Sequence, residues 1–90
     1  MDVKDLRFFV AVYELRGFAQ ASGRLNTVQS NVSSRILRLE DLIGAPLFLR
    51  HRRGVIPTPR GDMLYAYAKR VLALVEEATT EVKAGKDIAA

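Results

Sequence analysis

The polar side chains between Gln29 and Arg38 are the residues of this chain best suited to chemistry, and that chemistry is hydrogen bonding. Small hydroxyls and amides gather there with two arginines, at Gln29, Ser30, Asn31, Ser33, Ser34, Arg35 and Arg38. An exposed helix ordinarily favours Glu, Lys and Ala at such positions. Gln can form two hydrogen bonds with an adenine edge, and Ser can donate or accept one. The segment therefore holds the groups needed to recognise base edges in a groove of DNA.

A second polar set lies in the basic segment RHRRG, residues 50–54. The formal net charge of the chain is +4. Residues 1–58 hold nine Lys and Arg against five acids, whereas residues 59–90 hold five of each. This asymmetry indicates an anionic partner for the first two-thirds of the chain, although a merely solvated basic surface accounts for the charge equally well.

Catalysis and metal binding find little support in the sequence. His51 is the only histidine, and no carboxylate in its own segment could orient it. Cysteine is absent, which excludes disulfides, thiolate zinc sites and a cysteine nucleophile. The glycines are dispersed rather than gathered in a phosphate-binding loop. We therefore predict no enzymatic activity, no metal site and no cofactor.

A membrane anchor and an export signal are not predicted either. The longest apolar run is far shorter than the ~20 residues that a transmembrane helix needs. Residues 1–5 are charged and amphipathic, unlike the start of a signal peptide. We expect a cytoplasmic protein without a membrane partner.

Three helices are expected in the first half of the chain, at residues 2–16, 18–25 and 29–43. Asp2 is a suitable N-cap for the first helix, and Gly17 is expected to end it. The third helix is expected to end at Gly44. Apolar residues with helical spacing form the expected core faces of the first and third helices, at Leu6, Phe9, Val10, Tyr13, Val32, Ile36, Leu39 and Ile43.

Two short extended segments are expected at residues 47–58, around the basic loop. Pro46 prevents the third helix from continuing. Gly54 can supply a positive φ at the tip of the loop. Pro57 implies that the second segment is short or lies at an edge. The pattern predicts a small β-hairpin with a basic tip.

A long helix is expected over residues 59–84, with Thr58 as N-cap and Pro59 in the first turn. Its length of ~39 Å exceeds the ~26 Å diameter of a compact domain of this size. Part of it must therefore protrude, and its apolar face then needs a partner. The heptad-spaced and neighbouring apolar residues predicted to form a dimer are Leu64, Tyr67, Ala68, Val71, Leu74, Val75, Ala78 and Val82.

Two helices joined by the turn at residues 26–28, the second one longer, make the helix-turn-helix pattern, in which the start of the second helix enters the DNA major groove. We predict a mainly α fold in three parts. Residues 1–58 form a winged helix-turn-helix with a three-helix core and a β-hairpin wing, residues 59–84 form a dimerisation helix, and residues 85–90 begin a hinge or a frayed tail.

The chain resembles the N-terminal DNA-binding domain of the LysR-type transcriptional regulators of bacteria over residues 3–84. The matching motifs are LRFFVAV, GFAQAS.RL, QSNVSSRI..LE..IG.PLF.R..RG and TPRGDMLYAYAKRVL. The resemblance implies that Gln29 and Ser33 face bases, that the wing enters a minor groove, and that the long helix pairs antiparallel with a second copy. The implied target is double-stranded DNA with an interrupted inverted repeat. A small-molecule effector is implied only for a larger C-terminal domain, absent here.

Two departures from the family pattern affect the expected DNA contacts. Val28 stands where Ser or Thr often caps the recognition helix, so Thr27 is expected to take the cap. Ser34 replaces a common Arg, so phosphate contacts are expected to shift to Arg35 and Arg38. The residues predicted to contact DNA are Thr27, Gln29, Ser30, Asn31, Ser33, Ser34, Arg35, Arg38, His51, Arg52 and Arg53.

An interaction-only module is the alternative interpretation. In that case the heptad helix would bind a partner, and the helix-turn-helix would serve only as a scaffold. The wing discriminates between the two, because a scaffold has no need for four basic residues in one exposed loop beside a polar helix end. The sequence therefore favours DNA binding over the interaction-only module.

Overall fold

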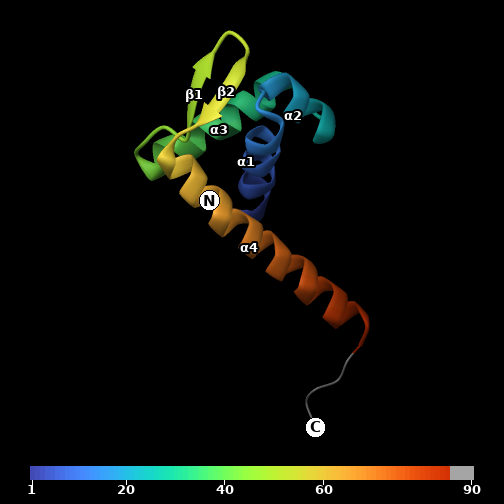
Figure 1. Cartoon of the computed structure of the whole chain (residues 1–90). Coiled ribbons are helices and arrows are strands. Elements are labelled where there is room, and N and C mark those ends of the chain that lie inside the picture. Colours follow the sequence, from blue (N-terminus) through green and yellow to red (C-terminus); the bar gives the residue numbers. More distant parts are fainter. Residues whose placement is uncertain (86–90) are drawn as a thin grey trace.

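The computed structural model describes residues 1–85, so most of the predicted tail at residues 85–90 lies outside the described residues. Three helices, a two-stranded hairpin and a fourth, long helix follow one another along the chain (Figure 1). Their bounds are α1 Val3–Leu15, α2 Phe18–Arg24, α3 Gln29–Ile43, β1 Phe48–His51, β2 Gly54–Pro57 and α4 Pro59–Lys83. The winged helix-turn-helix with a long last helix, predicted from the sequence, is confirmed.

Helix α1 is one residue shorter at each end than the predicted range of residues 2–16, and Asp2 is its N-cap as expected. Asp2 and Asp5 form a reciprocal capping box, in which each backbone N–H donates to the other carboxylate, at 2.9 and 2.8 Å. The expectation that Gly17 ends the helix is wrong: Arg16 takes the left-handed conformation, with φ 60°. Its N–H donates to Val12 and its carbonyl accepts from Val55, and these two bonds hold it there. Gly17 instead precedes α2 in an extended conformation.

The core lies where α1 and α3 cross, with the hairpin and the start of α4 closing it. The expected stripe of α3 is confirmed, since Val32, Ile36 and Leu39 are buried. The Phe9 ring of α1 lies 5.3 Å from the Phe48 ring of β1, measured between centroids. This packing fixes the side of α3 that faces inward, so its polar residues are left on the outside.

The hairpin is the wing predicted for residues 47–58. Its two four-residue strands pair antiparallel, with Phe48 opposite Pro57 and His51 opposite Gly54. Gly54 has φ 133°, and a Cβ there would collide with the carbonyl oxygen of Arg16. This close approach, together with the bond from Val55 N–H to the Arg16 carbonyl at 3.0 Å, ties the wing to the turn between α1 and α2.

Helix α4 projects from the domain as an arm (Figure 1). Thr58 caps it, because its hydroxyl accepts from the Gly61 N–H at 3.1 Å and donates to the Pro46 carbonyl at 2.8 Å. A Cβ at Gly61 would collide with the carbonyl oxygen of Leu47, so glycine allows the helix to start against the wing. The principal extents of 56 × 26 × 18 Å reflect the projecting arm, which the sequence predicted.

Candidate nucleic-acid interface

The outer face of α3 carries most of the polar residues singled out in the sequence. Ser33 is half-buried at the edge of this face. The helix starts at Gln29 after Val28, an N-cap that has no side-chain hydrogen bond. The first N–H groups of α3 therefore remain available to a phosphate at the helix start. The members of the group that are exposed are Gln29, Ser30, Ser34 and Arg38.

Thr27 and Asn31 use part of their hydrogen-bonding capacity on each other. The expectation that Thr27 caps α3 is wrong, because Val28 occupies the N-cap position. The Thr27 hydroxyl instead accepts from the side-chain amide of Asn31 at 3.0 Å. Both residues are half-buried, and their bond braces the turn before the recognition surface.

Arg35 has a different environment from the one expected of a phosphate contact. Its side chain is 14% exposed and pairs with the Asp5 carboxylate of α1 at 2.8 Å. The guanidinium also lies 4.8 Å from the centre of the Phe8 ring, and its buried Nε has no hydrogen-bond partner among the described residues. Arg35 thus holds α3 against α1, whereas Arg38, the other arginine expected to contact phosphate, is exposed.

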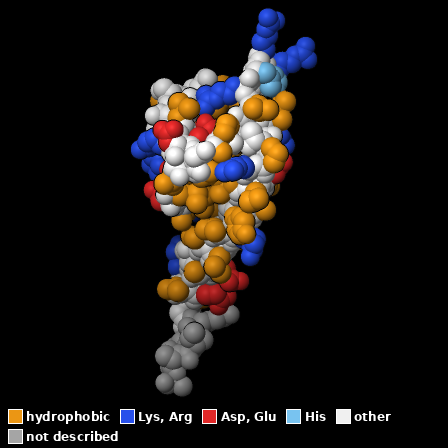
Figure 2. All heavy atoms as spheres, turned by 90° about the vertical axis from the view of Figure 1, so that its left-hand side faces the viewer, with side chains coloured by type: hydrophobic (Ala, Val, Ile, Leu, Met, Phe, Trp, Pro, Cys, Tyr) orange, Lys and Arg blue, Asp and Glu red, His pale blue; other side chains and the backbone are white. Residues whose placement is uncertain are grey.

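The wing presents its basic tip away from the body of the domain. Figure 2 shows Lys and Arg side chains at that tip, next to the histidine. Arg52 and Arg53 are exposed, and the Arg53 N–H donates to His51 Nδ1 at 3.3 Å. Arg50, on β1 opposite Val55, lies over the Phe18 ring at 4.6 Å and 3.8 Å from a carboxylate oxygen of Glu40. The Arg50 side chain is therefore held against the domain, whereas the two arginines of the tip project.

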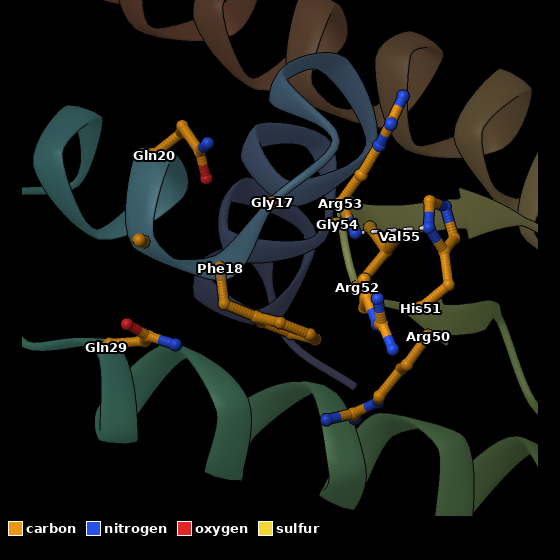
Figure 3. A pocket seen from close by; sticks show the side chains of 11 residues that line it. Gly17, Phe18, Gln20, Gln29, Arg50, His51, Arg52, Arg53, Gly54 and Val55 are labelled. Carbon is orange, nitrogen blue, oxygen red and sulfur yellow. Dashed lines mark hydrogen bonds between the residues drawn. The ribbon is translucent and has the colours of Figure 1, made fainter.

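A cleft of about 360 Å³ joins the wing to the start of α3. Figure 3 shows Gln29 on one side of this cleft and the basic residues of the wing on the other. No acidic side chain within residues 1–85 lines it. The polar helix start and the basic wing therefore form one continuous surface of positive character.

Gln20 and Phe18 of α2 also line this cleft, and the sequence-based list of contacts omits both. Gln20 is exposed beside buried Ala21. The sequence indicates that Gln20 lies opposite the small-residue face of α2. It does not indicate that Gln20 lines the same cleft as the wing.

Glu40 positions the wing relative to α3. One carboxylate oxygen accepts from the backbone N–H groups of Leu47 at 2.8 Å and Phe48 at 3.3 Å. A side chain of α3 therefore bonds the backbone at the start of β1 and links this helix directly to the wing. The angle between the two parts of the surface is therefore set by charge-assisted hydrogen bonds.

The apolar residues of α4 divide between two directions. The sequence predicts that both Leu64 and Ala68 face a second copy. Leu64 is packed against the core of its own domain and Ala68 is fully buried, so the prediction is wrong for Ala68. A heptad pattern does not show whether the apolar side of a helix packs against its own domain or against a partner. The large apolar residues that do face outward are 39–79% exposed: Met63, Tyr67, Val71, Leu74 and Val82. We call these five residues the outer stripe.

Residues 1–85 contain no helix that is both long and apolar enough to cross a membrane. The same residues contain no group of three or more His, Asp or Glu arranged to hold a metal ion.

Comparison with known proteins identifies the family. Residues 3–62 match the profile of the bacterial regulatory helix-turn-helix proteins of the lysR family. The HTH-type transcriptional regulator CzcR of Bacillus subtilis (strain 168) is 40% identical over 77 residues, which are 86% of this chain and 27% of that protein. This chain thus spans about a quarter of the length of that relative.

Solved structures agree with the sequence match. A crystal structure of a CbnR_DBD–DNA complex superposes with a TM-score of 0.90 at 29% identity, covering 97% of this chain and 100% of that one. A BenM_DBD/catB site 1 DNA complex gives a TM-score of 0.89 at 36% identity, covering 92% of each chain. From the profile match over residues 3–62, the winged fold and these relatives, the chain belongs to the LysR family of bacterial regulatory helix-turn-helix proteins.

Proposed function

We propose that this chain binds double-stranded DNA with sequence preference, as the DNA-binding portion of a bacterial transcriptional regulator acting in the cytoplasm. The observation that carries the proposal is the continuous surface formed by the exposed start of α3, the cleft and the basic wing. The similar CbnR and BenM structures are described as complexes with DNA, which supports it.

Helix α3 supplies the base contacts in this proposal. Its exposed first turn enters the major groove, where Gln29, Ser30 and Ser33 meet base edges. A good base contact contributes ~1–3 kcal/mol of discrimination. Ser34 and Arg38 lie beside them and contact the phosphates, while Thr27 and Asn31 hold the turn through their mutual bond.

The wing supplies a minor-groove contact. Arg52 and Arg53, with His51, reach the groove next to the one that α3 occupies. A narrow A·T minor groove concentrates negative potential, which favours inserted arginine. Arg50 stays against the domain, where Glu40 and Phe18 already hold it.

The chain acts as a dimer in this proposal, paired through the outer stripe of α4. Residues 60–70 carry three basic residues and one acid, whereas residues 76–83 carry one basic residue and three acids. Antiparallel pairing brings these oppositely charged halves together, and parallel pairing would not. Two recognition helices then face grooves about 34–36 Å apart or a multiple of it, which requires an interrupted inverted repeat.

Any response to a small-molecule effector is assigned to a further domain of a longer protein, as the family resemblance implies. No pocket of the described domain is needed for it in this proposal.

Fluorescence anisotropy across a salt series tests the proposal. Duplexes selected from random sequence are compared with random duplex DNA. We expect selected inverted repeats to bind far more tightly, with an affinity that falls steeply with salt. Equal binding to all duplexes, lost at moderate salt, would reject sequence-specific recognition.

The interaction-only module keeps one observation in its favour, the exposed outer stripe of α4. It predicts self-association without any sequence preference on DNA. The same anisotropy experiment, combined with sedimentation, therefore separates the two functions.

A further inference from the structure

The carboxylate of one α1 residue, Glu14, forms bonds that link three helices near the point where α4 projects from the domain. One oxygen of Glu14 accepts from the Tyr65 hydroxyl at 2.6 Å and from Lys69 Nζ at 3.4 Å, both on α4. The other oxygen accepts from Arg24 Nη1 of α2 at 2.8 Å. The start of the projecting helix is thus bonded to the helix-turn-helix itself.

A second bond runs between the same two helices in the opposite direction. The Tyr13 hydroxyl of α1 donates to a carboxylate oxygen of Asp62 on α4 at 2.7 Å. The Tyr13 and Tyr65 rings are stacked, with centroids 3.9 Å apart and planes 7° from parallel. Each ring thus bonds a carboxylate on the other helix. We call Tyr13, Glu14, Asp62 and Tyr65 the tyrosine clamp.

The protonation states needed for the tyrosine clamp are favoured by its own contacts. The Tyr65 hydroxyl, with Arg24 and Lys69, lowers the pKa of Glu14 to about 2. The bonds to Asp62 and Glu14 raise the pKa of Tyr13 and of Tyr65, respectively. Near neutral pH the Glu14 carboxylate is therefore charged and both tyrosine hydroxyls are protonated.

The tyrosine clamp adds directionality that the apolar contact between α1 and α4 lacks. Ala68 is buried and half-buried Leu64 and Leu72 pack against the core, and apolar burial is non-directional. Hydrogen bonds and ring stacking depend on angle and offset. The clamp therefore restricts the angle of α4 more than packing alone.

The arm beyond the clamp amplifies any change in that angle. From Tyr65 to Lys83, α4 extends about 27 Å, so a rotation of about 10° at the clamp moves its far end by about 5 Å. One base pair shifts a half-site by about 3.4 Å along DNA. A small change in the angle of α4 is thus comparable with one base pair of spacing.

We propose that the tyrosine clamp sets the distance between half-sites that the paired chains accept. This inference rests on the proposed function, because it requires a dimer that binds an inverted repeat. Its residues are positioning residues: they touch neither DNA nor the second copy, and they act through the direction of α4.

The test uses duplexes in which the half-sites of the selected repeat are moved apart or together by one base pair. The main variant, Tyr13→Phe combined with Tyr65→Phe, keeps both rings and removes both hydroxyl bonds. Glu14→Gln removes the charged acceptor, and Glu76→Gln, at an exposed position of α4 outside the tyrosine clamp, is its charge-matched control. A duplex with one half-site reports α3 and the wing alone, and sedimentation reports the dimer.

We expect the wild-type chain and Glu76→Gln to show one sharply preferred spacing. In the double variant and in Glu14→Gln, the penalty for the shifted spacings should fall by about fivefold, the lower end of coupling between sites. Affinity for the single half-site and the dimer mass should not change.

An unchanged spacing profile in the double variant would overturn the inference, and so would an equal loss of affinity at every spacing and on the single half-site. A wild-type dimer that binds the half-site specifically but accepts all spacings equally would also overturn it, and would leave the proposed function intact. A wild-type chain without sequence preference would remove the proposed function and this inference with it.

Discussion

Gln29 and Arg35 lie on the same helix, six residues apart, and the structure gives them opposite roles. Gln29 is exposed at the edge of the cleft, where its amide can meet a base. Arg35 turns inward to Asp5 and Phe8, where its charge is already neutralised. At the scale of single residues, a polar group can recognise a ligand only if the protein has not already bonded it.

Replacing Gln29 should relax sequence choice. We expect Gln29→Ala to lower the preference for the selected duplex over random DNA by about 1–3 kcal/mol, because one base contact is lost. Binding to random DNA should stay nearly unchanged, since Gln29 carries no charge. Anisotropy on both duplexes measures this, and an equal loss on both would contradict a role in base recognition.

Replacing Arg53 should weaken binding and lower its dependence on salt. We expect Arg53→Ala to reduce the slope of log affinity against log salt by about one contact, because one phosphate-neutralising charge is removed. Arg7→Ala removes the same charge from an exposed position on α1 that does not line the cleft. Identical slopes in the two variants would remove the wing from the interface.

At the scale of elements, one side of α4 packs against its own domain and another side is exposed to solvent. Ala68 is buried against the core, whereas Leu74 and Val82 of the outer stripe are exposed. The first half of the helix is docked by apolar packing and by the tyrosine clamp. Glu14 links α1 to this half of α4 through its bonds to Tyr65 and Lys69.

Acid should weaken this docking through Glu14. Its pKa is lowered from 4.5 to about 2 in the folded chain. The contribution of Glu14 to stability is therefore fully present above about pH 4.5 and is lost as the pH falls toward 2. We expect the denaturation midpoint of the wild-type chain to fall more steeply over this range than that of Glu14→Gln.

Glu76→Gln provides the control for this pH series. It removes one carboxylate from an exposed position of α4 outside the tyrosine clamp, and it should keep the wild-type slope. Parallel slopes for wild type and Glu14→Gln would show that the carboxylate does not contribute.

At the scale of the whole molecule, a compact winged domain carries an arm with an exposed apolar stripe. Figure 2 shows apolar side chains continuing from the domain along this arm. Such a surface on a projecting helix is costly in water unless another surface covers it. A second copy, with its charged halves in the opposite order, is the partner we propose.

A charge in the outer stripe should dissolve this dimer. We expect Val71→Asp to give a monomer in sedimentation, because pairing would bury an unpaired carboxylate. Ala73→Asp adds the same charge at an exposed position on the opposite side of α4 and should stay dimeric. A dimer in both variants would place the contact elsewhere on the molecule.

Most of the fold was predictable from the sequence because it depends on local signals. The cap at Asp2, the apolar stripe of α3, the left-handed Gly44 and the Thr58-Pro59 start of α4 each act within a few residues. The order of the helices, the hairpin and the long last helix follows from these local signals. The sequence motifs of the LysR family fall on the same elements in the same order.

Tertiary structure decided which of the predicted residues are free to act. It paired Arg35 with Asp5, buried Ala68, bonded Thr27 to Asn31 and placed Gln20 in the cleft that the wing also lines. It also joined Tyr13 and Glu14 to residues about fifty positions away. Sequence periodicity shows which face of a helix is apolar or polar, but contacts between distant segments determine what covers that face. The chain by itself therefore specified its elements and its family, and only their packing specified the available surface.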